Sequence, residues 1–105
     1  MLLYQSGVSS NTVLDRKRAE LLEQIAIILD NKHQFSEALI NYNRVLTLFN
    51  RPHLLKDRSL NHTKIRLLRR TAALLLHLGD HKRARQRYQF IYEQTGKWYN
   101  LPKLK

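Results

Sequence analysis

Two arginine-rich runs contain the residues whose chemistry is most distinctive in this sequence. The first is KIRLLRR at 64–70, and the second is KRARQR at 82–87. Guanidinium groups bind carboxylates and phosphates through paired, charge-assisted hydrogen bonds, so both runs predict an anionic partner. If that partner is a phosphate backbone, the residues that we expect to contact it are Lys64, Lys82, Arg83, Arg85 and Arg87.

The net charge is confined to the second half of the chain. The 105 residues include 19 Lys and Arg against 8 Asp and Glu, which gives a formal net charge of +11. Acidic and basic residues cancel over 1–50, whereas 51–105 contains only three acidic residues, Asp57, Asp80 and Glu93. Solubility alone would not require such segregation, so the asymmetry indicates an acidic partner.

The sequence predicts no catalytic or metal site. It has no cysteine, no glycine-rich phosphate loop and no Gly-x-Ser-x-Gly motif. His77, Asp80 and His81 are the one cluster with metal-ligand chemistry, but they straddle a turn at Gly79, and zinc needs three or four convergent ligands. We therefore expect a protein that is not an enzyme and has no cofactor, metal or small-molecule substrate. We expect His81 to pack at the turn.

Four helices would have to position the arginines. Apolar residues recur at three- and four-residue spacing from about Thr12 to Asn31, from Ser36 to Asn50, in a third segment closed by Gly79 and in a fourth that stops at Gly96. No segment alternates with the period of a strand. In the first helix, the expected core face consists of Leu14, Leu21, Leu22, Ile25, Ile28 and Leu29.

The two halves of the chain repeat one another at an offset of 46 residues. Ala26 and Ala38 then superimpose on Ala72 and Ala84, and small residues at these positions would let two helix backbones approach closely. The HQF and GDH links within the two repeats are too short for anything except antiparallel neighbours. Further matches are Leu22 with Leu68, Leu29 with Leu75, Tyr42 with Tyr88, Val45 with Ile91, and His33 with Gly79.

The repeated unit resembles the tetratricopeptide repeat over about residues 19–96. FSEALINYNRVL and LGDHKRARQRYQFIY are similar to the second helix of that repeat and its preceding turn. Val45 and Ile91 depart from the small residue usual in the family, and the offset exceeds the family's 34 residues. The residues that carry the resemblance are Leu22, Ile25, Ala26, Leu29, Phe35, Ala38, Tyr42 and Leu46, then Leu68, Ala72, Leu75, Gly79, Ala84 and Tyr88.

The resulting fold prediction is all-α, with two stacked antiparallel helix hairpins in a TPR-like α-α superhelix. We expect one domain over 1–105, with hairpin one at about 13–50, an insertion or helix extension at about 50–61, hairpin two at about 62–96 and a tail at 97–105. The aromatic tail would either cap the last helix or dock on another subunit. Any other antiparallel four-helix arrangement is the alternative to the repeat.

The resemblance also implies a groove lined by the first helix of each hairpin. Its partner-binding residues would be Ile27, Arg66, Arg69, Arg70, Ala73 and His77. Arg66 and Arg70 match the basic pair of the clamp with which some family members hold a terminal carboxylate. Glu23 and Ile27 stand where the clamp has Lys and Asn, so the clamp is incomplete, and we expect a more extended acidic or amphipathic segment.

The expected function is protein–protein interaction, as a scaffold or adaptor subunit of a larger assembly, with self-association left open. The alternative is binding to an RNA or other nucleic-acid backbone, as at the edge of a ribonucleoprotein particle. No apolar run is long enough for a membrane span, and the first residues have no basic and hydrophobic signal pattern. We expect an intracellular location, cytoplasmic before organellar.

Overall fold

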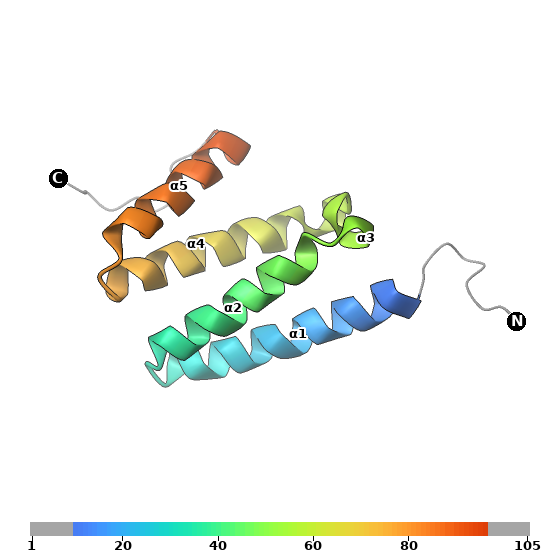
Figure 1. The fold of residues 1–105 in the computed structure, drawn as a ribbon, viewed down its shortest axis with the longest axis horizontal. Coiled ribbons are helices and arrows are strands. Elements are labelled where there is room, and N and C mark those ends of the chain that lie inside the picture. Colours follow the sequence, from blue (N-terminus) through green and yellow to red (C-terminus); the bar gives the residue numbers. More distant parts are fainter. Residues whose placement is uncertain (1–9, 97–105) are drawn as a thin grey trace, which may run out of the picture.

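The computed structural model describes residues 10–96, and all of its regular secondary structure is helical (Figure 1). The predicted tail at 97–105 lies outside the described residues. The elements are α1 (Ser10–Asn31), α2 (Phe35–Phe49), α3 (Pro52–Leu55), the 3-10 helix η1 (Arg58–Leu60), α4 (Asn61–His77) and α5 (His81–Thr95). The all-α prediction is confirmed, with four main helices and a short fifth. None of the helices in residues 10–96 combines the length and apolar composition needed to cross a bilayer.

Two helix hairpins make up the fold. α1 packs against α2, and α4 packs against α5, through short turns. The two turns use the same backbone conformation, because His33 and Gly79 both adopt left-handed angles, with φ of 62° and 86°. Asp80 caps α5 by accepting a hydrogen bond from the backbone N–H of Arg83 at 3.1 Å.

Alanines hold each hairpin together at the positions that the offset of 46 relates. Ala26, Ala38, Ala72 and Ala84 all have no exposed surface. A side chain of one carbon lets the two helix axes approach, and larger groups then fill the space one turn away. The aromatic residue one turn after the second alanine, Tyr42 in α2 and Tyr88 in α5, is buried in both hairpins.

α4 joins the hairpins by contributing to two cores. Leu67 and Leu74 of α4, together with Leu60 at the end of η1, are spaced seven residues apart and are buried in the core that hairpin one builds. Ile65, Leu68, Ala72 and Leu76 instead pack with Tyr88 and Ile91 of α5. Consequently the main helices follow one another in the order α1, α2, α4, α5, with α4 packed between α2 and α5 (Figure 1).

The segment between the hairpins, predicted as an insertion or a helix extension, forms α3 and η1. Pro52 begins α3, where its missing N–H costs nothing. Asp57 begins η1 by accepting a hydrogen bond from the backbone N–H of Ser59 at 2.9 Å. Leu54 and Leu60 are buried here, so the segment closes one end of the core.

The apolar face predicted for α1 coincides only in part with the face that points to the core. Leu22 and Leu29 are half-buried and pack against the core of hairpin one. Leu14, Leu21, Ile25 and Ile28 are 46–65% exposed. The buried positions of the helix are Asp15, Ala19, Ala26 and Asp30. Apolar periodicity did not identify the rest of this face, because two of its buried positions hold aspartates. These two aspartates are paired with Arg51 and Arg70, which lie 36 and 40 positions away. The packing role expected for His81 was also wrong, because that side chain is exposed.

Candidate functional site

The predicted groove lies where α4 passes α1, and its arginines are paired with acids of α1. Nη1 of Arg66 lies 2.5 Å from Oε2 of Glu23. Nε of Arg70 donates to Oδ2 of Asp30 at 2.6 Å, and its Nη2 forms a second ion pair with Oδ1 of the same carboxylate. The acids of α1 and the arginines of α4 therefore neutralise one another across the predicted groove.

Asp30 is the centre of this site because it also joins α1 to α2. Tyr42 donates its hydroxyl hydrogen to Oδ2 of Asp30 at 3.1 Å. The hydrogen bond from Arg70 lowers the pKa of Asp30, against the opposing effect of burial. Burial, followed by the negative charge of Asp30, raises the pKa of Tyr42 to about 12. The three side chains therefore keep their ordinary ionisation states at neutral pH and bind α1, α2 and α4 together.

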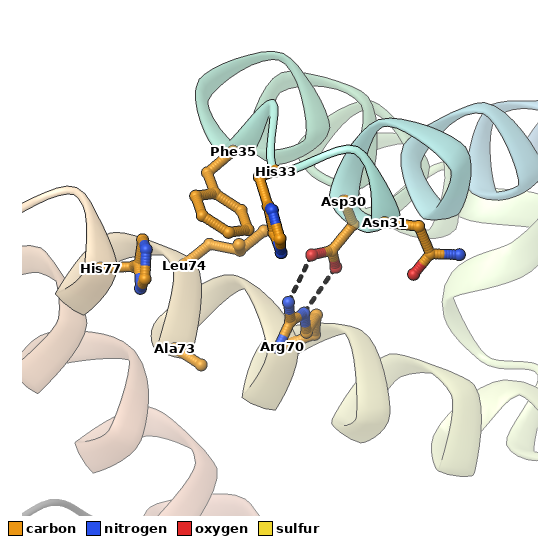
Figure 2. Close-up of a pocket in the computed structure, with 8 residues that line it drawn as sticks. All are labelled: Asp30, Asn31, His33, Phe35, Arg70, Ala73, Leu74 and His77. Atoms are coloured by element: carbon orange, nitrogen blue, oxygen red, sulfur yellow. Dashed lines mark hydrogen bonds and ion pairs between the residues drawn. The ribbon is translucent and has the colours of Figure 1, made fainter.

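A cavity of about 370 Å³ adjoins this ion pair (Figure 2). His77 packs edge-on against Phe35, with ring centroids 4.2 Å apart, and Ala73 and Leu74 of α4 complete the apolar side. His33, at the left-handed turn position, lies beside Phe35. The cavity therefore combines a half-exposed guanidinium with aromatic and apolar surface, which suits binding to a carboxylate or carbonyl group next to an apolar side chain.

The structure brings together some of the six predicted partner-binding residues and separates others. Arg70, Ala73 and His77 line the cavity, and Arg66 lies one turn before Arg70 on the same face of α4. Ile27 is half-buried against the core of hairpin one. Arg69 lies on the α5 side, where its charge acts on Tyr88.

The five residues predicted to contact phosphate differ in exposure and in the contacts that they already make within the chain. Lys64 donates to the backbone carbonyl of Leu55 at 3.2 Å. Arg87 is half-buried and donates to Oγ1 of Thr71 at 2.6 Å. Lys82, Arg83 and Arg85 are exposed on α5.

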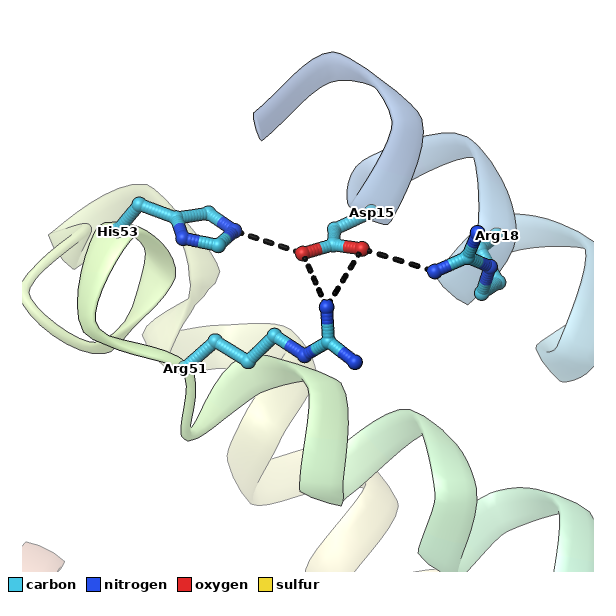
Figure 3. A network of polar contacts seen from close by, with 4 residues as sticks. All are labelled: Asp15, Arg18, Arg51 and His53. Carbon is cyan, nitrogen blue, oxygen red and sulfur yellow. Dashed lines mark hydrogen bonds and ion pairs between the residues drawn. The ribbon is translucent and has the colours of Figure 1, made fainter. Parts of the chain in front are cut away.

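A second polar cluster, around Asp15, could not be found by inspecting motifs (Figure 3). The side chain of Asp15 is only 3% exposed and lies 2.7 Å from Nε2 of His53. It also accepts hydrogen bonds at 3.1 Å from Arg18 and from Arg51. The hydrogen bond from His53 is the main cause of the lowered pKa of Asp15. This cluster fastens α1 to the segment between the hairpins.

Within residues 10–96, no group of three or more His, Cys, Asp or Glu side chains could hold a metal ion. The chemistry available at the groove is recognition by guanidinium and apolar groups. No family model, curated protein or solved structure matches this chain.

Proposed function

We propose that this chain is a non-catalytic protein-interaction module of the tetratricopeptide-repeat type, a small subunit of a larger assembly. Its basic second half binds an acidic or amphipathic segment of a partner. Two helix hairpins with matched buried alanines and matched left-handed turns support the repeat assignment.

The observation that carries the binding proposal is the uneven use of charges in ion pairs. Five of the eight acidic residues form ion pairs within residues 10–96, and of these five only Asp80 pairs with a residue of α5. Its contact with Arg83 is 3.5 Å long and solvent-exposed, so it neutralises little. Among residues 10–96, no ion pair joins Lys82, Arg85 or Arg87 to an acid. The other four paired acids are Asp15, Glu23, Asp30 and Asp57.

This excess of positive charge favours a partner that supplies carboxylates. A peptide adds apolar contacts to the charge pairs, and salt does not screen those contacts. Acidic peptide binding should therefore weaken only moderately as ionic strength rises.

The test compares three fluorescein-labelled probes by anisotropy on the full chain. They are a helical peptide of Glu and Leu residues, the same peptide with Gln in place of Glu, and a single-stranded RNA of similar length. We expect the Glu peptide to bind most tightly, with a shallow salt dependence. Equal binding of the Glu and Gln peptides would contradict the proposal.

The second candidate function is binding to a nucleic-acid backbone. The observation in its favour is that Lys82 and Arg85 are exposed on α5 with no acidic partner among the described residues. Six to ten phosphate contacts would reduce affinity by about 10³–10⁵ between 50 and 200 mM salt. RNA binding that is tighter than peptide binding and has this steep slope would establish the alternative.

A further inference from the structure

A second recess lies on the side of α4 opposite the predicted groove. Leu68 and Leu75 form its floor, on the other side of the helix from Arg70, Ala73 and His77. Its walls come from α2 and α5. Two adjoining cavities of about 410 and 480 Å³ make up this recess, and both are lined by Leu68 and Phe90. We call it the α2–α5 trough.

Apolar side chains from three helices line the trough along its length. α2 supplies Leu39 and Leu46, one heptad apart, and α5 supplies Phe90, which is 46% exposed. Ile65 of α4 extends the floor towards α3. An aromatic ring left half-exposed beside aliphatic groups is the kind of surface that a partner helix covers.

Positive charge is concentrated at the end of the trough near the hairpin turns. Arg83 and Arg87, one turn apart on α5, both line it there. Burial lowers the pKa of Arg87, and the positive charge of Arg83 adds to this effect. Lys64 lines the opposite end. An anion beside the two arginines would relieve their mutual repulsion.

One polar atom of the wall also lacks a partner. The side-chain oxygen of Asn43 is buried and accepts no hydrogen bond among the described residues. Asn43 lines the trough next to Leu39 and the arginine end. A hydrogen-bond donor from a bound segment would satisfy this oxygen.

We propose that the α2–α5 trough binds an acidic amphipathic helix of a partner protein, with a carboxylate between Arg83 and Arg87 and apolar side chains over Leu68, Leu75 and Phe90. This inference rests on the proposed function and assigns its binding surface. It places the partner on the opposite side of α4 from the groove that the repeat resemblance implies.

The partner segment is helical because the trough has no backbone groups to offer. Its walls and floor are helices whose N–H and C=O groups already bond to one another. An extended segment would find no strand edge there to pair with its backbone N–H and C=O groups. A helix forms these backbone hydrogen bonds within itself. The α2 wall runs from Leu39 to Asn50, about 16 Å at 1.5 Å per residue, which corresponds to about three helical turns.

The charge of the trough favours an acidic partner helix over residues 97–105 and over a second copy of this chain. Residues 97–105 contain three lysines and no acidic residue, so their charge opposes placement beside Arg83 and Arg87. A second copy of the chain carries a net charge of +11 and would be repelled as well.

The experiment uses the full chain and a synthetic 14-residue helical peptide with Leu at positions 4, 8 and 11 and Glu at positions 1 and 5, a design based on helical periodicity of about 3.6 residues. Affinity is measured by anisotropy for the wild type, Arg83→Glu and Arg85→Glu. The two variants change the net charge equally, but only Arg83 lines the trough. We expect Arg83→Glu to weaken binding about tenfold and Arg85→Glu to change it less than about threefold.

Phe90→Ala and Ile28→Ala form a second matched pair. Phe90 is 46% exposed and lines the trough, whereas Ile28 is 53% exposed on α1. We expect only Phe90→Ala to weaken binding. Backbone amide shifts in the NMR spectrum then locate the peptide, and we expect changes at Leu39, Asn43 and Leu68.

Each other result overturns the inference in a distinguishable way. Shift changes confined to Arg70 and His77, with affinity lost in Arg66→Glu, would move the partner to the groove and leave the proposed function standing. No binding to either surface would overturn both. Trough shifts that depend on protein concentration, or that change when 97–105 is deleted, would assign the trough to a second copy or to the tail. An equal loss of peptide affinity in Arg83→Glu and Arg85→Glu, together with RNA binding that is tighter than peptide binding, would indicate that the basic residues of α5 bind nucleic acid.

Discussion

Arg70 donates hydrogen bonds to both carboxylate oxygens of Asp30, which lies 40 positions earlier in the chain. Because Asp30 is nearly buried and also bonds to Tyr42, this contact fixes how the second hairpin sits on the first. A residue that the sequence places in a binding groove therefore has a structural role too.

Loss of the Arg70–Asp30 ion pair should lower the free energy of unfolding more than loss of the Arg66–Glu23 ion pair. Arg70→Met removes the bidentate partner of a buried carboxylate, and we expect the free energy of unfolding to fall by about 1–3 kcal/mol. Arg66→Met breaks the more exposed pair with Glu23, and we expect a loss below about 1 kcal/mol. Urea denaturation measures both losses. Equal losses would show that the buried pair with Asp30 stabilises the fold no more than the exposed pair with Glu23 does.

The close helix contacts should not tolerate larger side chains. Ala38→Leu or Ala84→Leu inserts a branched group where no surface is exposed, and we expect a loss of about 1–3 kcal/mol from overpacking. Glu37→Leu, at an exposed position beside Ala38, is the control. Unchanged thermal unfolding of both alanine variants would contradict the packing.

Substitution of the left-handed residue should stabilise the protein in the first turn, at His33, and destabilise it in the second turn, at Gly79. His33→Gly relieves the cost of a side chain at φ 62°, and we expect a gain of about 0.5–1 kcal/mol. Gly79→Ala should lose about 1 kcal/mol through backbone conformation alone, because a Cβ there would meet no atom within 4 Å. Calorimetry on both variants checks the pair, and a loss in His33→Gly would mean that the ring contacts of His33 outweigh its backbone strain.

Acid should destabilise the fold through Asp15 and Asp30. Partners hold the pKa of both carboxyl groups below the ordinary value. Their contribution is therefore complete above the unfolded-state pKa and is lost as pH falls through the lower folded-state pKa, from about pH 5 towards pH 2. We expect the melting temperature of the wild type to fall over this range more steeply than that of Asp15→Asn/Asp30→Asn. Parallel pH profiles would contradict the assignment.

Much of the fold could be predicted because the hairpins are built from local patterns. Matched alanines and turn residues at an offset of 46 identify the helix pairs, and the structure buries those alanines. Only part of the core face of α1 could be found, because Asp15, which is buried on that face, is paired with Arg51 and His53, and no helical periodicity connects these residues to it. The pairing of Glu23 with Arg66 and of Asp30 with Arg70 was not predicted either, because each pair joins two helices across 40 or more positions of the chain.

Because α5 packs chiefly against α4, it is attached to the rest of the molecule along one side. Its amide hydrogens should exchange with solvent faster than those of α2, which packs between α1 and α4. Hydrogen-exchange mass spectrometry would resolve the two helices. A ligand in the α2–α5 trough would contact both α5 and α2 and would link the two helices. We therefore expect α5 to gain the most protection from hydrogen exchange when the ligand binds. Binding in the trough would then be measurable as slower hydrogen exchange in α5, the last helix of the row.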